Sequence, residues 1–345
     1  FFCWIMSTHG LRHDEISAPG VVASLTLESI IFEGKSEFQK LSIVKTQAYG
    51  KCLFMDGQIQ SAELDEFIYH ESLVQPSMFL HPNPKRVFIG GGGEGATARE
   101  VLRHKEVTLC VMADLDKKAT DLAEEHMPEW SQGAFKDPRF KLVNDDARKV
   151  LLSYPDGFFD VVILDLCDPL DFGPCYTLYS SEFYDDCFAK TADDGVFVTQ
   201  SACSNFSRTS EVWAPVHNTL KHSRFSFVYP YSVHIPSFLD GWGFVLACKA
   251  AQASNGEGLP RAQVAQVDPK AVDEHMAKRM DTSVFKHYDG GAHRQMFTLN
   301  KWQRDAFAKE SRIICEQTPI YVNHVASEIK PADRTHEPDT KKQKV

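Results

Sequence analysis

Two carboxylates close a buried strand near the middle of this chain. Residues 161–164 form an apolar run, and Asp165 and Asp168 follow it before Pro169. In an open α/β sheet, ligands bind beyond the carboxyl ends of the strands. Two acids at such an end, with no basic residue between them, favour a cationic ligand. We interpret this ligand as an amine that is about to act as a nucleophile.

A carboxylate at a strand end can assist such an amine in two ways. A free alkyl amine has a pKa of about 10, so only roughly one molecule in a thousand carries the attacking lone pair at pH 7. The carboxylate can hold the ammonium group and then accept its proton, and desolvation lowers the pKa of the amine.

A glycine-rich turn is the second feature that could do chemistry. Residues 90–95 read Gly-Gly-Gly-Gly-Glu-Gly, and a helix is predicted from Ala96. Glycines let the backbone turn tightly and approach a ligand closely. Asp114 ends the next predicted strand, about twenty residues further on, where a carboxylate can accept hydrogen bonds from ribose hydroxyls.

The ligand of this turn has three interpretations. The turn matches the G-x-G-x-x-G pattern of dinucleotide sites, which is weak evidence by itself. Glu94 argues against a dinucleotide, because its carboxylate would repel a pyrophosphate at the helix N-terminus. The same carboxylate suits a nucleoside with a positive group, such as the sulfonium of an S-adenosyl compound. A structural turn without a ligand is the third interpretation.

Further acids follow the neighbouring strands. Asp146 and Ala147 come after the third strand, where an acid and a backbone amide could contact an adenine edge. Asp146 as the N-cap of the next helix is an equally good explanation. Together with Glu94, Asp114 and Asp165, these acids finish four consecutive strands. Crowded acids raise one another's pKa unless a cation joins them, so we predict an acidic crevice that binds cations.

Aromatic residues and one histidine could complete the crevice. Tyr69 lies on the helix before the sheet, and Phe238 and Trp242 lie in a turn between the last two strands. Aromatic faces attract alkylammonium groups by about 0.5–2 kcal/mol per contact, although packing in the core explains isolated aromatics equally well. His70 could accept a hydrogen bond from an amine when neutral, or be an exposed helical residue without a role.

The elements that must position these residues fall into two groups. Strands are predicted at 21–27, 38–44 and 52–55, followed by an amphipathic helix at 65–80. Strands are then predicted at 86–89, 107–113, 140–144, 159–164 and 195–200, with helices at 96–104, 117–126, 146–153, 181–190 and 208–221. Strand and helix alternation indicates a parallel, doubly wound sheet. Apolar runs at 225–230 and 242–248 predict an antiparallel hairpin that finishes it.

Composition narrows the class of protein. The chain has 345 residues, is 43% hydrophobic and carries a net charge of -10. This charge and the lack of a basic stripe argue against nucleic acid, and suit a small cationic substrate. No apolar run is long enough to span a membrane. Nine cysteines, none in a C-x-x-C pair, predict reduced, buried thiols and a cytoplasmic location.

Three segments resemble the spermidine synthase family of aminopropyltransferases, over roughly residues 36–249. They are GGGEGATAREVLRHKEV, DLCDPLDFGPCYTLYSSEFY and HIPSFLDGWGF. The resemblance implies an N-terminal antiparallel β-domain and a Rossmann-like, methyltransferase-type catalytic domain. It also implies transfer of the aminopropyl group of decarboxylated S-adenosylmethionine to a polyamine, with release of 5′-methylthioadenosine. The resemblance implies no metal or redox cofactor, and it implies a homodimer or homotetramer formed through the N-terminal strands.

The resemblance assigns roles on the acceptor side and at the reacting centre. Asp165 resembles the proton acceptor of the family, and Asp168 resembles its partner in gripping the amine. Glu94 takes the position of the acid that holds the aminopropyl end of the donor. Tyr69 resembles the tyrosine of the pocket.

The resemblance also assigns residues that bind the nucleoside part of the donor. Asp114 resembles the acid that binds the ribose, and Asp146 with Ala147 resembles the pair that contacts adenine. Gln39 resembles the donor-binding glutamine of the family.

Four features depart from typical spermidine synthases, and one of them is Asp-Leu-Cys-Asp-Pro at 165–169 in place of a more serine-rich segment. Glu94 stands where Asp is usual, His70 where Gln is usual, and Ile235 where Tyr is usual. The segments Tyr-His-Glu at 69–71, Gly-Gly-Glu-Gly-Ala-Thr-Ala-Arg-Glu at 92–100 and Pro-Ser-Phe at 236–238, with a nearby Trp-Gly, resemble the thermospermine synthase branch. That branch extends spermidine at its aminopropyl end. Loss of a hydroxyl at Ile235 would make that wall drier and could admit a longer chain.

The expected domains are residues 21–82 for the β-domain and 83–325 for the catalytic domain with a C-terminal extension. Residues 1–20 and 326–345 are expected to be disordered. Spermidine is the expected acceptor, with putrescine, agmatine or the other end of spermidine as alternatives. A methyltransferase on the same fold and an inactive polyamine-binding homologue are the remaining hypotheses.

Overall fold

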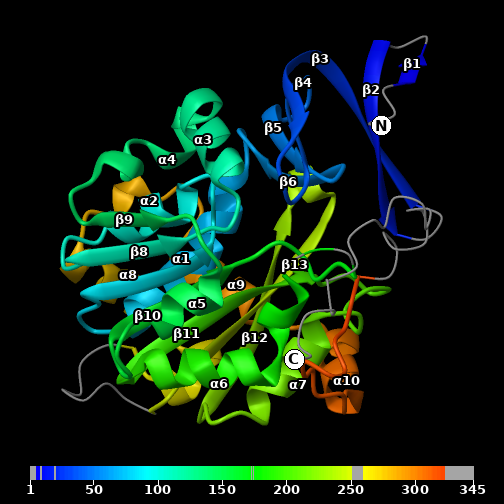
Figure 1. Ribbon diagram of the computed structural model, residues 1–345. Coiled ribbons are helices and arrows are strands. Elements are labelled where there is room, and N and C mark those ends of the chain that lie inside the picture. The colour runs from blue at the N-terminus through cyan, green and yellow to red at the C-terminus, as the bar shows by residue number, and fades with distance from the viewer. Residues whose placement is uncertain are drawn as a thin grey trace, which may run out of the picture.

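The computed structural model describes residues 5–7, 10–18, 21–171, 173, 175–250 and 259–322. Two β-sheets organise these residues (Figure 1). The predicted disordered tail at 326–345 and most of the linker at 250–260 lie outside the described residues. No helix among the described residues is long and apolar enough to cross a membrane.

The N-terminal sheet is antiparallel and has six strands in the order of the sequence. Its strands are β1 (Ile5–Ser7), β2 (Gly10–Ala18), β3 (Val21–Lys35), β4 (Lys40–Thr46), β5 (Gly50–Met55) and β6 (Gln58–Ala62). The strand β2 lies where the sequence predicted disorder. It is held because it pairs with β3 and because His13 Nε2 hydrogen-bonds the Gly57 carbonyl at 2.9 Å.

The second sheet is the predicted doubly wound sheet, and this expectation is confirmed. Its seven strands run in the order β12-β13-β11-β10-β7-β8-β9. They are β7 (Arg86–Gly91), β8 (Leu109–Ala113), β9 (Phe140–Val143), β10 (Phe159–Asp165), β11 (Thr191–Cys203), β12 (Phe227–Ile235) and β13 (Asp240–Cys248). Strands β7 to β11 pair in parallel, and β13 adds the antiparallel hairpin with β12.

Helices cover both faces of this sheet (Figure 1). They are α1 (Glu66–Leu80), α2 (Ala96–Leu102), α3 (Lys117–His126), α4 (Pro128–Ser131), α5 (Ala147–Leu152), α6 (Ser181–Lys190), α7 (Trp213–Lys221), α8 (Pro269–Arg279), α9 (Gly290–Met296) and α10 (Lys301–Lys309). Alternate residues of each central strand enter separate clusters on the two faces. Ile163 packs in one cluster and its neighbour Val162 in the other.

The helix α1 is not the amphipathic helix that the sequence predicted. It is buried almost all round, including the polar residues His70, Glu71 and Gln75. The C-terminal extension covers its outer side, where the Glu71 carboxylate accepts hydrogen bonds from the backbone of Lys286, His287 and Tyr288 at 2.8–2.9 Å. Hydrogen bonds made by buried polar groups therefore hold α1 within the catalytic domain.

Candidate active site

The site lies at the carboxyl edge of the parallel strands, where the winding of the sheet reverses between β7 and β10. The chain proceeds from β7 to β8 and β9 on one side, and returns to β10 on the other. Such a reversal leaves a crevice in which ligands bind. Gly91 has a φ of 81°, and a Cβ there would stand 2.1 Å from the Asp165 carbonyl oxygen. Only glycine therefore allows the turn after β7 to pass this close to β10.

A cavity opens at this edge, and it brings together most of the residues that the sequence selected. Its lining includes Gln39, Tyr69, Glu94, Asp114, Asp146, Ala147, Asp165, Asp168, Phe238 and Trp242. The acids come from β9, β8, β7 and β10, which are neighbours in the sheet. His70 and Ile235 are not among the lining residues.

Asp165 is the acid at the centre of the crevice. Its Oδ1 accepts a hydrogen bond from the Tyr69 hydroxyl at 2.7 Å, and its Oδ2 accepts one from Thr97 Oγ1 at 2.6 Å. Burial, and then the charge of Glu94, raise the pKa of Asp165, against the lowering effect of His70 and the two hydroxyls. A carboxylate with a raised pKa is a better proton acceptor near neutral pH than an exposed one.

His70 stands behind the crevice and is charged, which corrects the expectation of a neutral hydrogen-bond acceptor. Its Nδ1 donates to the Glu66 carboxylate at 2.8 Å, and its Nε2 donates to Glu94 Oε1 at 3.1 Å. Burial opposes the charge, but the hydrogen bonds and charges of Glu66 and Glu94 outweigh it and raise the pKa of His70 to about 10. Arg99 holds Glu66 through two hydrogen bonds of 2.9 Å. His70 therefore orients Glu94 instead of meeting the amine.

His70, Glu94 and Asp165 also satisfy the spacing of a metal site, with their ligand atoms within 4.8 Å of one another. A metal ligand must offer a lone pair, and an imidazolium has none. Because both ring nitrogens of His70 donate to carboxylates, this cluster favours an ammonium group over a metal ion.

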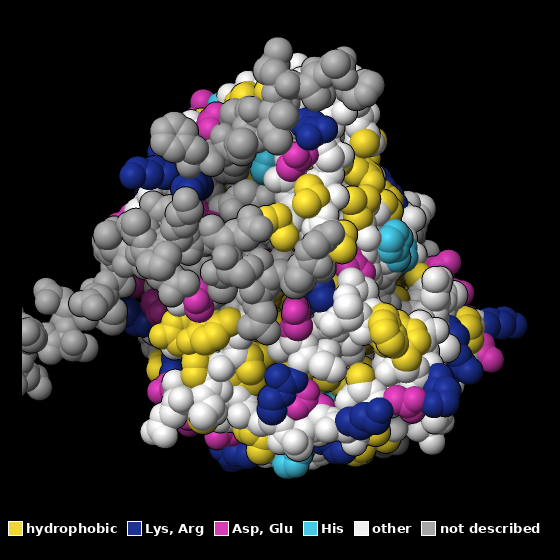
Figure 2. Space-filling model, turned by 90° about the vertical axis from the view of Figure 1, so that its right-hand side faces the viewer, with side chains coloured by type: hydrophobic (Ala, Val, Ile, Leu, Met, Phe, Trp, Pro, Cys, Tyr) yellow, Lys and Arg dark blue, Asp and Glu magenta, His cyan; other side chains and the backbone are white. Residues whose placement is uncertain are grey.

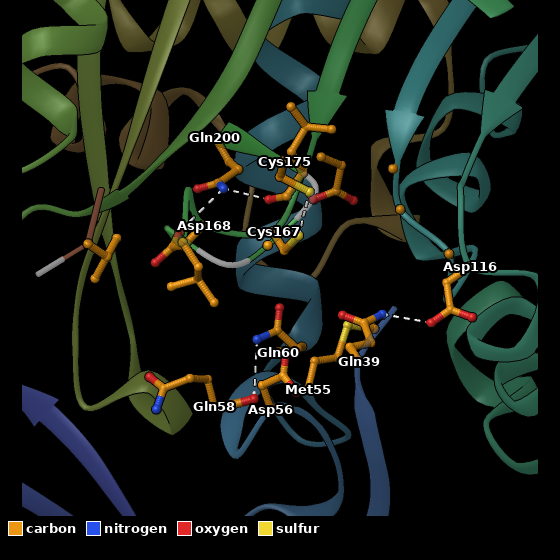
Figure 3. A pocket seen from close by; sticks show the side chains of 18 of the residues that line it. Gln39, Met55, Asp56, Gln58, Gln60, Asp116, Cys167, Asp168, Cys175 and Gln200 are labelled. Atoms are coloured by element: carbon orange, nitrogen blue, oxygen red, sulfur yellow. Dashed lines mark hydrogen bonds between the residues drawn. The ribbon is translucent and has the colours of Figure 1, made fainter. Parts of the chain in front are cut away.

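Asp114 and Asp116 line the cavity beyond the end of β8. Asp114 Oδ1 accepts a hydrogen bond from the Asp116 backbone at 2.9 Å. Burial, and the charges of Glu94, Asp116 and Asp165, raise the pKa of Asp114 to about 7. Gln39 reaches across from the N-terminal sheet, and its Nε2 donates to Asp116 Oδ2 at 2.9 Å (Figure 3).

Asp146 combines the two roles that the sequence left open. It is the N-cap of α5, where its carboxylate accepts a hydrogen bond from the Lys149 backbone at 2.7 Å. It also lines the cavity together with Ala147. The cap fixes the backbone at the end of β9, at the edge of the cavity.

Asp168 begins the other side of the cavity. Gln200 Nε2 approaches Asp168 Oδ1 at 3.4 Å (Figure 3), and Gln200 Oε1 accepts a hydrogen bond from Trp242 Nε1 at 3.2 Å. Burial raises the pKa of Asp168 to about 6, and Arg208 limits the rise. The ring of Phe238 packs edge-on between Trp242, at 4.8 Å, and Tyr69, at 6.1 Å.

Glu15 is a lining residue that the sequence reasoning missed. It comes from β2, and its Oε2 accepts a hydrogen bond from the Ile59 backbone at 3.1 Å. Burial raises the pKa of Glu15 to about 7, with Arg208 lowering it and Asp168 raising it. The available signal was the alternation of His13 and Glu15 with outward-facing Asp14, which indicates a strand where we expected none.

Ile235 does not form a wall of the cavity, contrary to our expectation. It is 1% exposed and belongs to the core cluster beneath α1, together with Tyr231. The two residues lie on the same face of β12 because they are four positions apart in a strand. The Tyr231 hydroxyl donates to the Ser72 carbonyl at 2.9 Å, so this face points into the core.

Sequence comparison agrees with this geometry. Residues 66–256 match the family described as spermine/spermidine synthase domain. The chain belongs to this family. Residues 12–63 match the spermidine synthase tetramerisation domain, which indicates a homo-oligomer.

Proteins similar to this spermine/spermidine synthase family member are named as enzymes of polyamine synthesis. A polyamine aminopropyltransferase of Aeropyrum pernix is 40% identical over 296 residues, which cover 86% of this chain and 90% of that protein. Thermospermine synthase ACAULIS5 of Arabidopsis thaliana is 36% identical over 301 residues, covering 87% and 84%. A spermidine synthase in complex with the transition state analogue AdoDATO has a TM-score of 0.75 and 27% identity, covering 89% and 98%. The chain is a polyamine aminopropyltransferase with a methyltransferase-like fold.

Proposed function

We propose that this aminopropyltransferase transfers the aminopropyl group of decarboxylated S-adenosylmethionine to spermidine, giving thermospermine and 5′-methylthioadenosine. The observation that carries the proposal is the line of carboxylates along one cavity. Asp114 and Glu94 lie on the side of the glycine turn, Asp165 lies at the centre, and Asp168 and Glu15 lie beyond it. Two cationic substrates can be held end to end by acids spread in this way.

The reaction follows from the placement of these acids. Asp114 can accept hydrogen bonds from the ribose of the donor, and Glu94 can bind the ammonium group at the aminopropyl end. Asp165 holds the attacking amine and accepts its proton, so that the nitrogen lone pair forms the new N–C bond as the C–S bond breaks. The electron pair of that bond stays on sulfur, which neutralises the sulfonium.

The acceptor side suits a molecule with more than one positive charge. Asp168 and Glu15 both carry raised pKa values, and Arg208 is the cation near both of them. Arg208 is already paired with Glu211, at 3.1 Å. Two carboxylates are thus left for ammonium groups beyond the reacting amine, which favours a triamine over a diamine.

We also propose that the reaction needs no metal or redox cofactor, because every step uses a carboxylate or a charge of the substrates. A homotetramer or homodimer formed through the N-terminal strands is part of the same proposal. The long strand β3 leaves Val21, Val22, Ile30 and Ile31 exposed by 38–59%. Figure 2 shows apolar side chains among charged ones on this side of the molecule. A cytoplasmic location stays a prediction.

Product analysis tests the proposed function. The purified enzyme is given decarboxylated S-adenosylmethionine with spermidine, putrescine or agmatine, and the products are separated chromatographically. We expect spermidine to be the best acceptor and thermospermine to be the tetraamine. Spermine as the product, or a faster reaction with putrescine or agmatine, would contradict the proposal. Release of S-adenosylhomocysteine from intact S-adenosylmethionine would favour a methyltransferase.

The role of Glu15 can be tested against a matched control residue on the same strand. Asp14 precedes it and points outward, where it accepts a hydrogen bond from Ser24 Oγ at 2.6 Å. Glu15→Gln should raise KM for spermidine roughly tenfold, because a charged hydrogen bond contributes about 1.5–3 kcal/mol. Asp14→Asn should leave that KM unchanged. Equal effects of the two substitutions would show that Glu15 does not bind the triamine.

A further inference from the structure

Two cysteines face each other in the wall of the cavity. Cys167 lies between Leu166 and Asp168, and Cys175 follows on the same loop, eight positions later. Their sulfur atoms are 2.6 Å apart, and both side chains line the cavity (Figure 3). Both thiols are half-buried, so small reagents that enter the cavity can reach them.

This pair differs from the other cysteines that the structure describes. Most of those are buried in the core: Cys52, Cys110, Cys187, Cys203 and Cys248. Cys315 is half-buried, but its partner is the Thr318 hydroxyl at 2.9 Å. The expectation of reduced thiols in the core therefore does not describe Cys167, which faces the substrate cavity.

The backbone on both sides of the pair is fixed. The Cys167 carbonyl accepts a hydrogen bond from the Tyr179 hydroxyl at 3.0 Å, and the Cys175 carbonyl accepts one from the Leu178 backbone at 2.9 Å. Sulfur atoms in a disulfide are ~2.05 Å apart. The two sulfurs therefore need to approach by only roughly 0.5 Å to form a bond.

We propose that Cys167 and Cys175 form a redox modification site, which a low-molecular-weight disulfide such as oxidised glutathione converts to an intramolecular disulfide, and that this disulfide slows use of the polyamine. The Cys175 thiolate attacks one sulfur of oxidised glutathione and releases one glutathione thiolate. Cys167 then loses its proton and attacks the Cys175 sulfur, releasing the second glutathione. Two protein thiols are oxidised, and one glutathione disulfide is reduced to two thiols.

The disulfide should act on the acceptor side through Asp168. Cys167 is bonded directly to Asp168 in the chain, and on its other side the Leu166 carbonyl accepts a hydrogen bond from Gln200 Nε2 at 2.5 Å. A shift of a reacting group by ~1 Å can cost about 100-fold in rate, so we expect a loss of roughly tenfold in kcat/KM for the polyamine. Affinity for methylthioadenosine should stay the same.

Peptide mass mapping tests the modification. The full-length enzyme is incubated with oxidised glutathione, remaining thiols are alkylated, and the digest is searched for a peptide that links Cys167 to Cys175. We expect this linked peptide in the wild type and in Cys315→Ser, and not in Cys175→Ser. Absence of the linked peptide in the wild type would overturn the proposal, and this readout does not depend on which polyamine the enzyme uses.

Kinetics test the consequence of the modification. The oxidised enzyme is compared with the same sample after treatment with dithiothreitol, using the polyamine that the product analysis identifies. We expect the loss in kcat/KM to be reversed by dithiothreitol, and Cys175→Ser to keep its own rate when treated with oxidised glutathione. A linked enzyme with unchanged polyamine kinetics would show that the disulfide has no effect on activity.

Discussion

At the scale of single residues, the proposed mechanism assigns the base to Asp165 and the anchor of the donor to Glu94. Asp165 lines the cavity and accepts two hydroxyl hydrogen bonds, whereas Glu94 accepts a hydrogen bond from the charged His70. The two carboxylates therefore differ in their surroundings, which is how neighbouring acids take different roles in one site.

Replacing Asp165 by Asn should abolish most turnover. The amide keeps the size of the carboxylate but cannot accept the proton of the amine, and loss of a general base costs about 10²–10⁴-fold in rate. Methylthioadenosine release gives kcat, and calorimetry with methylthioadenosine should show unchanged affinity. Thr97→Val removes one hydrogen bond to the same carboxylate and should cost much less. A near-normal rate for Asp165→Asn would exclude it as the base.

Replacing Glu94 by Gln should weaken the donor but not the product. Decarboxylated S-adenosylmethionine carries the ammonium group that Glu94 is proposed to bind, and methylthioadenosine lacks it. A hydrogen bond to a charged group contributes about 1.5–3 kcal/mol, so we expect roughly a tenfold or greater loss in donor affinity. Equilibrium dissociation constants for both ligands provide the test. An equal loss for methylthioadenosine would mean that Glu94 acts on the whole site.

The sequence could predict some of these residues and not others, for physical reasons. Asp114, Asp146 and Asp165 were predictable because parallel strands bring their carboxyl ends to one edge. Glu15 was not, since it reaches the cavity from a different sheet and is fixed by Ile59, 44 positions away. The charge of His70 depends on Glu66 and Glu94. The spacing of four from Glu66 was visible in the helix, but Glu94 meets His70 only in the fold.

At the scale of elements, local signals decided which helices and strands could be predicted. The parallel strands are continuous apolar runs and were easily found. The helix α9 was missed because it begins with Gly290 and Gly291, which favour other conformations. It forms because Asp289 caps it, accepting a hydrogen bond from the Ala292 backbone at 2.7 Å, and because it packs on α8.

Because the glycine turn passes very close to β10, we expect Gly91→Ala to reduce both stability and activity severely. The new Cβ would lie 2.1 Å from the Asp165 carbonyl oxygen, so the end of β10 must move. We expect a loss of more than about 2 kcal/mol in the free energy of unfolding, together with lost activity. Gly133→Ala is the matched control, because Gly133 also has a positive φ, of 89°, but has nothing within 4 Å of the new Cβ. Similar denaturation midpoints for the two variants would contradict this packing argument.

At the scale of the whole molecule, the cavity gathers several acids that are only partly ionised near neutral pH when no substrate is bound. The pKa of Asp114 and that of Glu15 are both about 7, and the pKa of Asp168 is about 6. An acid whose pKa is raised in the folded state binds its proton more tightly than in the unfolded chain. Its contribution to stability is therefore present at low pH and lost as the pH rises through the folded pKa. The substrates offset this loss because their positive charges favour the ionised acids.

Binding of the polyamine should consequently release protons, and its affinity should depend on pH. Below about pH 6 the acids are mostly protonated and bind cations weakly, whereas above about pH 8 they are ionised, so Kd should fall across this range and then level off. Calorimetry in buffers of different ionisation enthalpy measures the protons released, with methylthioadenosine bound first to fill the nucleoside side. Glu15→Gln should release fewer protons than Asp14→Asn, which retains every acid of the cavity. No release of protons on binding, together with an affinity that does not change between these pH values, would show that the acids are fully ionised before the polyamine arrives.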